Sequence, residues 1–404
     1  PSALIVHRGA SATANPQNAL YAAATQRVAD IHRTPAAGWF LIGQAPGQST
    51  LTSSIRLRRP ATFGCRGLIQ EESSRESKPM PHESQTKREP SPPDSAPPTR
   101  RPAAGLHLQR LPDGHRIKPS DVLPILSIHL LCLAVPLVGW SWIAVGTAVG
   151  LLFGRMFFIT AFYHRYFSHR TFRTHRVTQF LFALGGVTAA QRGPIWWAAH
   201  HRNHHRHSDH EPDIHSPSLK GLIWSHTVWF LSEQGQRIDW SQTPDWKKYP
   251  ELRWLERNHM IGPLLLSGAL AGAGWLLGAY FPSSGTSALQ MVIWGFAVST
   301  TLLYHGTFTI NSLAHTIGTR RFQTTDDSRN NWLLALLTLG EGWHNNHHYF
   351  PGSARQGFYW WEIDITWYLL VALERIGIIW DLRPVPSRVY EAAVRHSRKG
   401  GASP

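Results

Sequence analysis

Cysteine is scarce in this chain of 404 residues, which contains only Cys65 and Cys132. Two cysteines, one of them inside an apolar run, provide no disulfide framework and no candidate nucleophile. Acidic residues are also in the minority, because 25 Asp and Glu stand against 40 Lys and Arg and leave a net charge of +15. No nucleic-acid-binding motif accompanies this charge, so nucleic acid is not among the expected partners.

The first 117 residues lack the hydrophobic pattern of a folded domain. Residues 71–104 are Pro-rich and charged, and such a segment buries too little apolar surface to offset its ordering entropy. We therefore expect residues 1–117 to be disordered. The first methionine is Met80, and one hypothesis is that the natural protein starts there, with residues 1–79 as translated upstream sequence. The alternative is an organelle transit peptide, and no secretory signal is evident.

Four apolar stretches follow, at about residues 122–138, 141–163, 260–281 and 287–310. A helix needs about 20 residues to cross the core of a bilayer. The second and fourth stretches are long enough, the third is adequate although Gly-rich, and the first is short. Tight turns join the first stretch to the second and the third to the fourth. The sequence therefore predicts an all-α integral membrane protein with four transmembrane helices in two hairpins.

Charge placement predicts the orientation of these spans. The two tight turns contain no Lys or Arg, whereas basic residues flank the other ends of the stretches. Positive residues in short loops collect on the cytoplasmic side, so we expect both termini and the basic ends on that side. The flanking residues are Arg116, Lys118, Arg165, Arg170, Arg173, Arg176, Arg253, Arg257, Arg320 and Arg321.

Three further apolar runs are too short or too interrupted by polar residues to span a bilayer. They lie at residues 177–190, 221–231 and 359–380, and their composition favours helices that lie in the membrane interface. A fifth span at the last of these would place the C-terminus on the opposite side. We assign residues 118–385 to one membrane domain and residues 386–404 to a polar C-terminal tail.

Histidine is abundant, with 24 residues. Two clusters share the spacing HxxHH, and residues three and four apart lie on one face of a helix. The histidines of the remaining cluster are five apart, which predicts His164 on the last turn of a helix and His169 just beyond it. The clusters comprise His164, His169, His201, His204, His205, His344, His347 and His348.

Eight imidazoles at this spacing suffice for two metal ions, because a zinc site uses about three or four protein ligands. A loop that scavenges zinc would explain one cluster and not three. Imidazole suits iron, zinc, copper or nickel, and affinity does not choose among them. The ligand count favours a paired, redox-active centre at the cytoplasmic face. The outlying His207, His210, His215 and His226 are expected to be loop or interfacial residues.

These residues resemble a known family. The three clusters, the context Glu341-Gly-Trp-His-Asn-Asn-His-His and the stretch Asn311-Ser-Leu-Ala-His315 are similar to the membrane-bound acyl-CoA fatty acid desaturases of the delta-9, or stearoyl-CoA, type. The resemblance covers about residues 123–383. The segment Gly193-Pro-Ile-Trp-Trp looks like the bacterial branch of that family.

The resemblance implies a cytosolic helical domain that caps the spans and carries a diiron site. Its activity would be oxygen-dependent insertion of a cis double bond into a long-chain saturated fatty acyl substrate, acyl-CoA at the delta-9 position. Two iron ions would be the cofactors and O2 the co-substrate, with Asn311 acting through water. The implied ligands are His164, His169, His201, His204, His205, His315, His344, His347 and His348.

The implied partners are the acyl substrate, membrane lipids and a separate electron donor. The donor would be a cytochrome b5 or a ferredoxin with its reductase, since the chain contains no HPGG haem-binding motif. The carrier stays open between CoA, acyl carrier protein and an intact lipid. The third cluster begins with His344 where front-end desaturases carry Gln, which favours the delta-9 type.

Two alternatives remain at this stage. A membrane diiron hydroxylase of fatty acids, alkanes or carotenoids uses similar histidine clusters. A histidine-rich metal transporter would place acidic residues or histidines inside the spans, where only His129 and His305 occur.

Several side chains have two interpretations. Trp197, Tyr304 and Phe308 are candidates for lining an acyl tunnel, or else they pack ordinarily. The basic loop residues Arg192 and Arg202, together with Lys220, either contact phosphates of a carrier or are solvated charges.

Overall fold

The computed structural model describes residues 117–399, with side chains described up to residue 393. This part of the chain is helical, and its one sheet is the antiparallel pair of β1 (Arg173–Thr174) and β2 (Ile379–Trp380). The predicted disorder of residues 1–117 and the question of Met80 fall almost entirely outside the described residues.

The first predicted hairpin is present. Its first arm comprises α2 (Pro119–Leu131), η1 (Cys132–Ala134) and α3 (Val135–Val138). Gly139 follows with a positive φ of 65°, which a residue without Cβ adopts easily. The return arm is α4 (Trp142–Phe157), continued without a break by the π-helix η2 (Phe158–Ser168).

The second hairpin is built similarly. It begins with α11 (Ile261–Tyr280) and turns at η6 (Pro282–Ser284). Three consecutive helical segments form its return arm, followed by a short 3-10 turn. These are α12 (Ala288–Val292), η7 (Ile293–Val298), α13 (Ser299–Ser312) and η8 (Leu313–His315).

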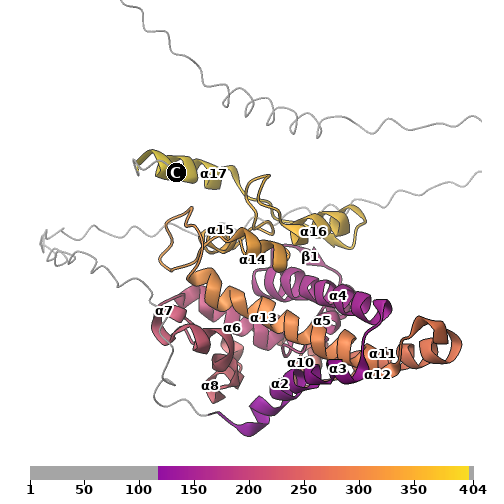
Figure 1. The fold of residues 1–404 in the computed structure, drawn as a ribbon. Helices are drawn as coiled ribbons and strands as arrows, with labels where there is room; N and C mark the ends of the chain where they lie inside the picture. Colours follow the sequence, from indigo (N-terminus) through magenta and orange to yellow (C-terminus); the bar gives the residue numbers. More distant parts are fainter. Residues whose placement is uncertain (1–116, 400–404) are drawn as a thin grey trace, which may run out of the picture. The chain divides into compact units, whose positions relative to one another are not determined.

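Three helices are long and apolar enough to cross a membrane, namely Pro119–Val138, Trp142–Ser168 and Ile261–Tyr280. The fourth span, predicted at about residues 287–310, is helical from Ala288 onward but is not among them. Two polar side chains of this stretch have a hydrogen-bond partner inside the protein. The buried guanidinium of Arg155 donates to Thr300 Oγ1 at 2.8 Å and to Ser299 Oγ at 2.5 Å. The polar face of α13 is thus directed at α4, beside which it runs (Figure 1).

Short helices surround these hairpins. Between the two hairpins they are α5 (Arg176–Val187), α6 (Pro194–His207), α7 (Pro217–Lys220), η3 (Trp224–Val228), η4 (Trp229–Leu231), α8 (Glu233–Gln236), η5 (Trp240–Gln242), α9 (Pro244–Lys247) and α10 (Pro250–Arg257). After the second hairpin they are α14 (Trp332–Leu337), α15 (His344–Tyr349), α16 (Ile365–Arg375) and α17 (Ser387–Lys399).

The apolar run at residues 359–380 does not form a fifth span. Its helix α16 has 11 residues, a length of about 16 Å against a bilayer core of about 30 Å. The region assigned to a polar tail contains α17, and its Val389 and Ala393 pack with Phe322 and Phe358.

Candidate metal centre

The histidine clusters sit where elements end or meet. His164 lies near the carboxyl end of η2, and His169 is the residue that caps it, as the five-residue separation predicted. The two HxxHH clusters are on α6 and α15. In Figure 1 these helices flank the carboxyl end of α13, after which His315 follows. Segments far apart in sequence therefore deliver imidazoles to one place.

Five of the histidines form one group, in which all ligand atoms lie within 4.8 Å of one another. Nε2 of His169 is 2.8 Å from Nε2 of His201, and Nε2 of His347 lies 3.0 Å from that of His164 and 2.8 Å from that of His205. Two nitrogens bound at right angles to one metal at about 2.1 Å stand about 3.0 Å apart. The spacing of this first group is thus that of ligands to a shared ion.

The other four histidines form a second group with the same spacing. Its members are His204, His315, His344 and His348, and Nε2 of His315 lies 3.0 Å from Nε2 of His344. Each HxxHH cluster is divided between the groups. Its first and last histidines, four apart, join one group and the middle histidine joins the other. The nine histidines implied by the family resemblance are therefore those that the structure brings together.

In four of these histidines a carboxylate contacts Nδ1, the ring nitrogen that points away from the shared site. Nδ1 of His204 donates to Asp213 at 3.0 Å, Nδ1 of His315 to Asp209 at 2.8 Å and Nδ1 of His348 to Asp326 at 2.7 Å, while Nδ1 of His164 contacts Glu341. Such partners fix the ring orientation and leave Nε2 free to bind a metal. The sequence reasoning did not identify the three aspartates. The acidic residues just after the second cluster were the available signal for two of them.

The carboxylate of Glu341 is itself anchored. Arg165 is buried, and its guanidinium donates to Glu341 at 3.1 Å and to Asp364 at 3.1 Å. Asp364 also caps α16 by accepting from the backbone of Trp367. The basic residue Arg165, interpreted from sequence as part of a cytoplasmic collar, is therefore an internal support of the histidine site.

The neutral form of imidazole, which binds metals, is favoured at six of the nine histidines. Burial and the neighbouring imidazoles hold the pKa well below its usual value at His169, His201, His205, His344 and His347. Burial also lowers the pKa of His348 to about 4, although Asp326 opposes it. Neutral imidazole is the form that ligates metals.

Several ring nitrogens are also buried without a hydrogen-bond partner among the described residues. They are Nδ1 of His344, Nδ1 of His347 and Nε2 of His348. For His348 this nitrogen is the one that faces the second group, because Asp326 occupies Nδ1. The donor set and its unpaired atom therefore fit imidazole-bound metal ions.

Asn311 lies beside the histidines. A small cavity of about 40 Å³ is lined by Asn311 together with His204, His344 and other residues of both walls. No hydrogen bond of the Asn311 side chain occurs within the described residues. The position is compatible with contact through a water molecule, the role that the family resemblance implies.

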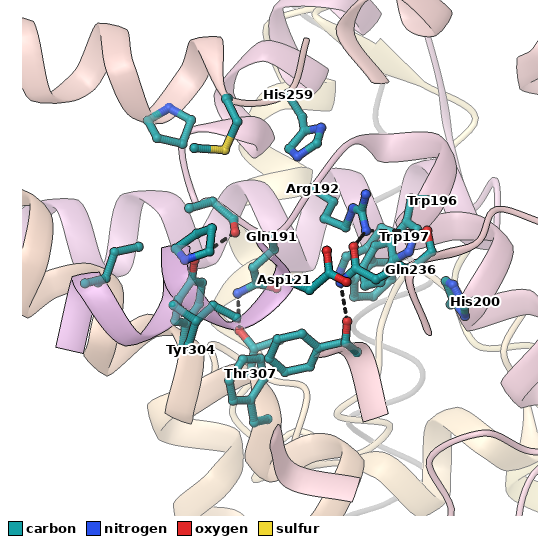
Figure 2. A pocket seen from close by; sticks show the side chains of 18 of the residues that line it. Asp121, Gln191, Arg192, Trp196, Trp197, His200, Gln236, His259, Tyr304 and Thr307 are labelled. Carbon is teal, nitrogen blue, oxygen red and sulfur yellow. Dashed lines mark hydrogen bonds between the residues drawn. The ribbon is translucent and has the colours of Figure 1, made fainter. Parts of the chain in front are cut away.

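A larger cavity of about 470 Å³ reaches His201 of the first group. Figure 2 shows part of its lining. Trp197, Tyr304 and Phe308 line the cavity, and so do Asn311 and His201. The same three aromatic side chains also pack in one apolar cluster, so the cavity lining does not decide between the two interpretations. Its walls come from α2, α6, α11 and α13. Figure 2 shows Gln191, Arg192, Asp121 and Gln236 at this cavity.

The outlying histidines differ from one another. Nδ1 of His215 donates to Asp213 at 2.7 Å, and this carboxylate also holds His204, so His215 belongs to the immediate surroundings of the second group. His210 bonds the backbone of Ser208. His226 belongs instead to a separate row with His305 and His129.

Comparisons with known proteins agree with this site. The family model described as fatty acid desaturase matches residues 140–379. The acyl-CoA 5-desaturase AL21 of Anemone leveillei is 36% identical over 284 residues, which is 67% of this chain and 82% of that protein. The sn-2 palmitoyl-lipid 9-desaturase of a Nostoc strain is 37% identical over 257 residues, 62% of this chain and 85% of that protein.

A further relative differs from both in substrate and position. The palmitoyl-monogalactosyldiacylglycerol delta-7 desaturase of Arabidopsis thaliana is 38% identical over 266 residues, 65% of this chain and 68% of that protein. Similarity therefore extends across CoA and lipid substrates and across several positions of the double bond. The chain belongs to the fatty acid desaturase family and is an oxidoreductase that acts on fatty acyl substrates.

Proposed function

We propose that this enzyme carries out oxygen-dependent desaturation of a long-chain saturated fatty acyl group at a nine-histidine diiron centre. The substrate is acyl-CoA and the product carries a cis double bond at the delta-9 position. The observation that carries the proposal is the convergence of nine histidines in two groups, one of whose members, His201, also lines a cavity of about 470 Å³.

Two iron ions would be held by the two histidine groups. Bound iron with O2 supplies the oxidising power for an unactivated C–H bond. Asp209, Asp213, Asp326 and Glu341 keep a proton at Nδ1 of their histidines and fix the rings. Asn311 would hold a water molecule beside the second group.

The cavity orients the acyl chain. Trp197 and His201 lie on one wall of the cavity, and Tyr304 and Phe308 on another. This largely aromatic lining excludes water from the reacting carbons and favours a chain that runs along α6 toward the metals. The depth at which the chain is held decides which carbons reach them, and the delta-9 proposal requires carbons 9 and 10 to lie beside the metals.

The site requires delivery of electrons and access from the membrane. A separate cytochrome b5 or ferredoxin with its reductase would supply two electrons for each turnover. We infer four membrane spans with both termini and the histidines on the cytoplasmic side, as the charge pattern predicted. The inward-facing polar residues of α13 are compatible with a fourth span, since they are satisfied by Arg155 inside the bundle.

The proposed reaction is tested by expressing the full chain with a compatible donor and profiling cellular fatty acids. The expected result is a new monounsaturated species whose double bond mass spectrometry locates between carbons 9 and 10. The matched control is the His204→Ala chain, which should yield none. Hydroxylated products without new double bonds would establish the hydroxylase instead, and a double bond elsewhere would correct the position alone.

A further inference from the structure

A charged side chain, Arg155, lies near the middle of an apolar helix. Residues Trp142–Ser168 are long and apolar enough to cross a membrane, and Arg155 is only 2% exposed. Within the described part of the chain, no carboxylate lies within ion-pair distance of its guanidinium. The titratable side chain that acts on it electrostatically is the phenol of Tyr304, which is uncharged at neutral pH. Charged groups inside a membrane are costly and as a rule functional, so the contacts of Arg155 indicate what it does.

The guanidinium of Arg155 fastens three helices at one point. Nε donates to the carbonyl of Leu151 on α4 at 3.1 Å. Nη1 donates to the carbonyl of Thr188, which caps the end of α5, at 3.1 Å and to Oγ1 of Thr300 on α13 at 2.8 Å. Nη2 donates to Oγ of Ser299, also on α13, at 2.5 Å. All three nitrogens are therefore used, and only a guanidinium offers donors in such a planar fork.

Two more contacts join the segment after α5 to α13. The hydroxyl of Tyr304 donates to the carbonyl of Ala190 at 2.8 Å, and the side-chain amide of Gln191 donates to Thr307 at 2.9 Å. Figure 2 shows Gln191, Tyr304 and Thr307 at the large cavity. Residues 188–191 are thus joined to α13 at three levels, of which the guanidinium provides the one furthest from the histidine site.

The residues of α13 that face these contacts form a stripe. Thr300, Tyr304, Thr307 and Asn311 are four, three and four residues apart, so they lie on one face of the helix. Tyr304, Thr307 and Asn311 line the large cavity, whereas Thr300 does not. The hydroxyl of Thr300 accepts instead from Arg155. The side chain of Arg155 therefore occupies the level at which this face of α13 stops lining the cavity.

Residues 188–191 belong to another wall of the same cavity. Ala190 and Gln191 line it, and Ala190 has a positive φ of 57°, a conformation uncommon for a residue with a side chain. These residues connect α5 with α6 and lie in neither a helix nor a strand. Their position relative to α13 therefore depends on the three levels of contact, and so does the distance between the two walls.

On this basis, and resting on the proposed function, we propose that Arg155 is a positioning residue that fixes the width of the acyl cavity beside the histidine site. It acts through the stripe on α13 and through residues 188–191, and it does not contact the substrate itself. A cavity of fixed width accepts an unbranched acyl chain and rejects a chain with a methyl branch, because an extra carbon in a fitted site forces its surroundings apart. Arg155 thereby contributes selectivity for straight chains.

Binding is measured on the full purified chain by the change in tryptophan fluorescence, since Trp196, Trp197 and Trp229 line the cavity. The two probes are stearoyl-CoA and the same thioester with one methyl branch at mid-chain. The wild-type chain should bind the straight probe about tenfold to a hundredfold more tightly than the branched one. In Arg155→Met this ratio should fall by about tenfold, with iron content at the wild-type level. A purely structural role would weaken both probes together and leave their ratio unchanged.

The matched control is Ser299→Ala. Ser299 accepts from the same guanidinium but lies outside the stripe, and its loss leaves the bonds of Arg155 to Thr188 and Thr300 in place. The ratio should therefore stay at the wild-type value. If Arg155→Met does not fold, Thr300→Val carries the test, because it removes one acceptor with little change of shape, and the ratio should then fall part of the way.

The two proposals can fail separately. A ratio in Arg155→Met equal to that of the wild-type chain, or a wild-type ratio near one, would overturn the role of Arg155. If the wild-type chain binds neither thioester, the proposed acyl-CoA substrate is wrong, and the same pair of chains as monoglycerides then provides the ratio that decides the role of Arg155.

Discussion

Two sets of imidazoles in this molecule contact one another through ring nitrogens, and they differ in what stands behind them. In the nine-histidine site, four rings are backed by carboxylates. In the row on α2, α13 and η3, Nε2 of His129 lies 3.2 Å from Nε2 of His305, and Nδ1 of His305 lies 3.0 Å from Nε2 of His226. The ends of the row contact the Ile125 carbonyl and Ser312 Oγ.

The row satisfies itself without a metal. Each neutral ring can donate once to the next, and His129 can donate to the carbonyl of Ile125 at 2.8 Å. The hydroxyl of Ser312, which donates to the carbonyl of Phe308, then shares its proton with Nδ1 of His226. The nine-histidine site cannot satisfy its ring nitrogens in this way. Nε2 of His347 faces both Nε2 of His164 and Nε2 of His205, and one proton cannot serve both contacts well. Short distances between histidines alone therefore do not identify a metal site, whereas convergence with carboxylate backing does.

The sharpest test of this difference compares His204→Ala with His305→Ala. Removing His204 should abolish double-bond formation and lower bound iron, because it deletes a ligand, while His305→Ala should retain both. Iron content by mass spectrometry and product analysis give the two readouts. Normal turnover in His204→Ala would refute its role as a ligand, and iron loss in His305→Ala would mean that the row is part of the centre.

Removing a backing carboxylate should have the next largest effect. Asp326→Asn takes the negative partner from Nδ1 of His348, and we expect metal affinity or activity to fall about tenfold to a hundredfold. Metal titration of the apo-protein measures the change. The control is Asp239→Asn, an aspartate that bonds only Ser241 and Gln242. Equal affinities in both variants would contradict the support role.

Asn311→Ala should lower activity by about tenfold with little loss of iron, since a contact through water tunes a site rather than forming it. Both quantities are measured on the same preparation. Iron loss as large as that of His204→Ala would indicate direct ligation by Asn311.

Acid should destabilise the metal-free protein through the buried histidines whose pKa is lowered in the folded state. The pKa of His348 is lowered to about 4. Between pH 6.5 and about 4, the unfolded chain therefore binds protons that the folded chain does not bind. Stability should therefore fall as pH falls through this window, by roughly 1 kcal/mol per pH unit for each such histidine. Thermal unfolding in detergent at stepwise pH measures the slope, and His348→Gln should make it shallower. A flat profile would contradict the burial of neutral imidazoles.

The smallest effect is expected in the row itself. His226→Phe removes hydrogen bonds between helices, which contribute about 0.6 kcal/mol each inside membranes. We expect a slightly lower unfolding temperature with iron content and product unchanged. A loss of iron comparable with that of Asp326→Asn would remove the distinction drawn between the two sets.

Much of the fold was predictable because its signals are local. Apolar runs and tight turns identified both hairpins, and the five-residue separation of His164 and His169 correctly located the end of a helix. The fourth span was harder to judge. Its serines and threonines lower its apolar character, and their partner Arg155 lies far away in sequence.

The sequence identified eight of the nine histidines by their spacing, and the resemblance of the stretch Asn311-Ser-Leu-Ala-His315 to a known family added His315. Only the tertiary structure decided how they are divided between two groups, since HxxHH places three rings on one broad face without stating what each ring faces. The aspartates behind the rings and the contacts of Arg165 with Glu341 and Asp364 were likewise hidden. A carboxylate or a cation acquires its role from partners that are distant in sequence, and only packing brings those partners within hydrogen-bond reach.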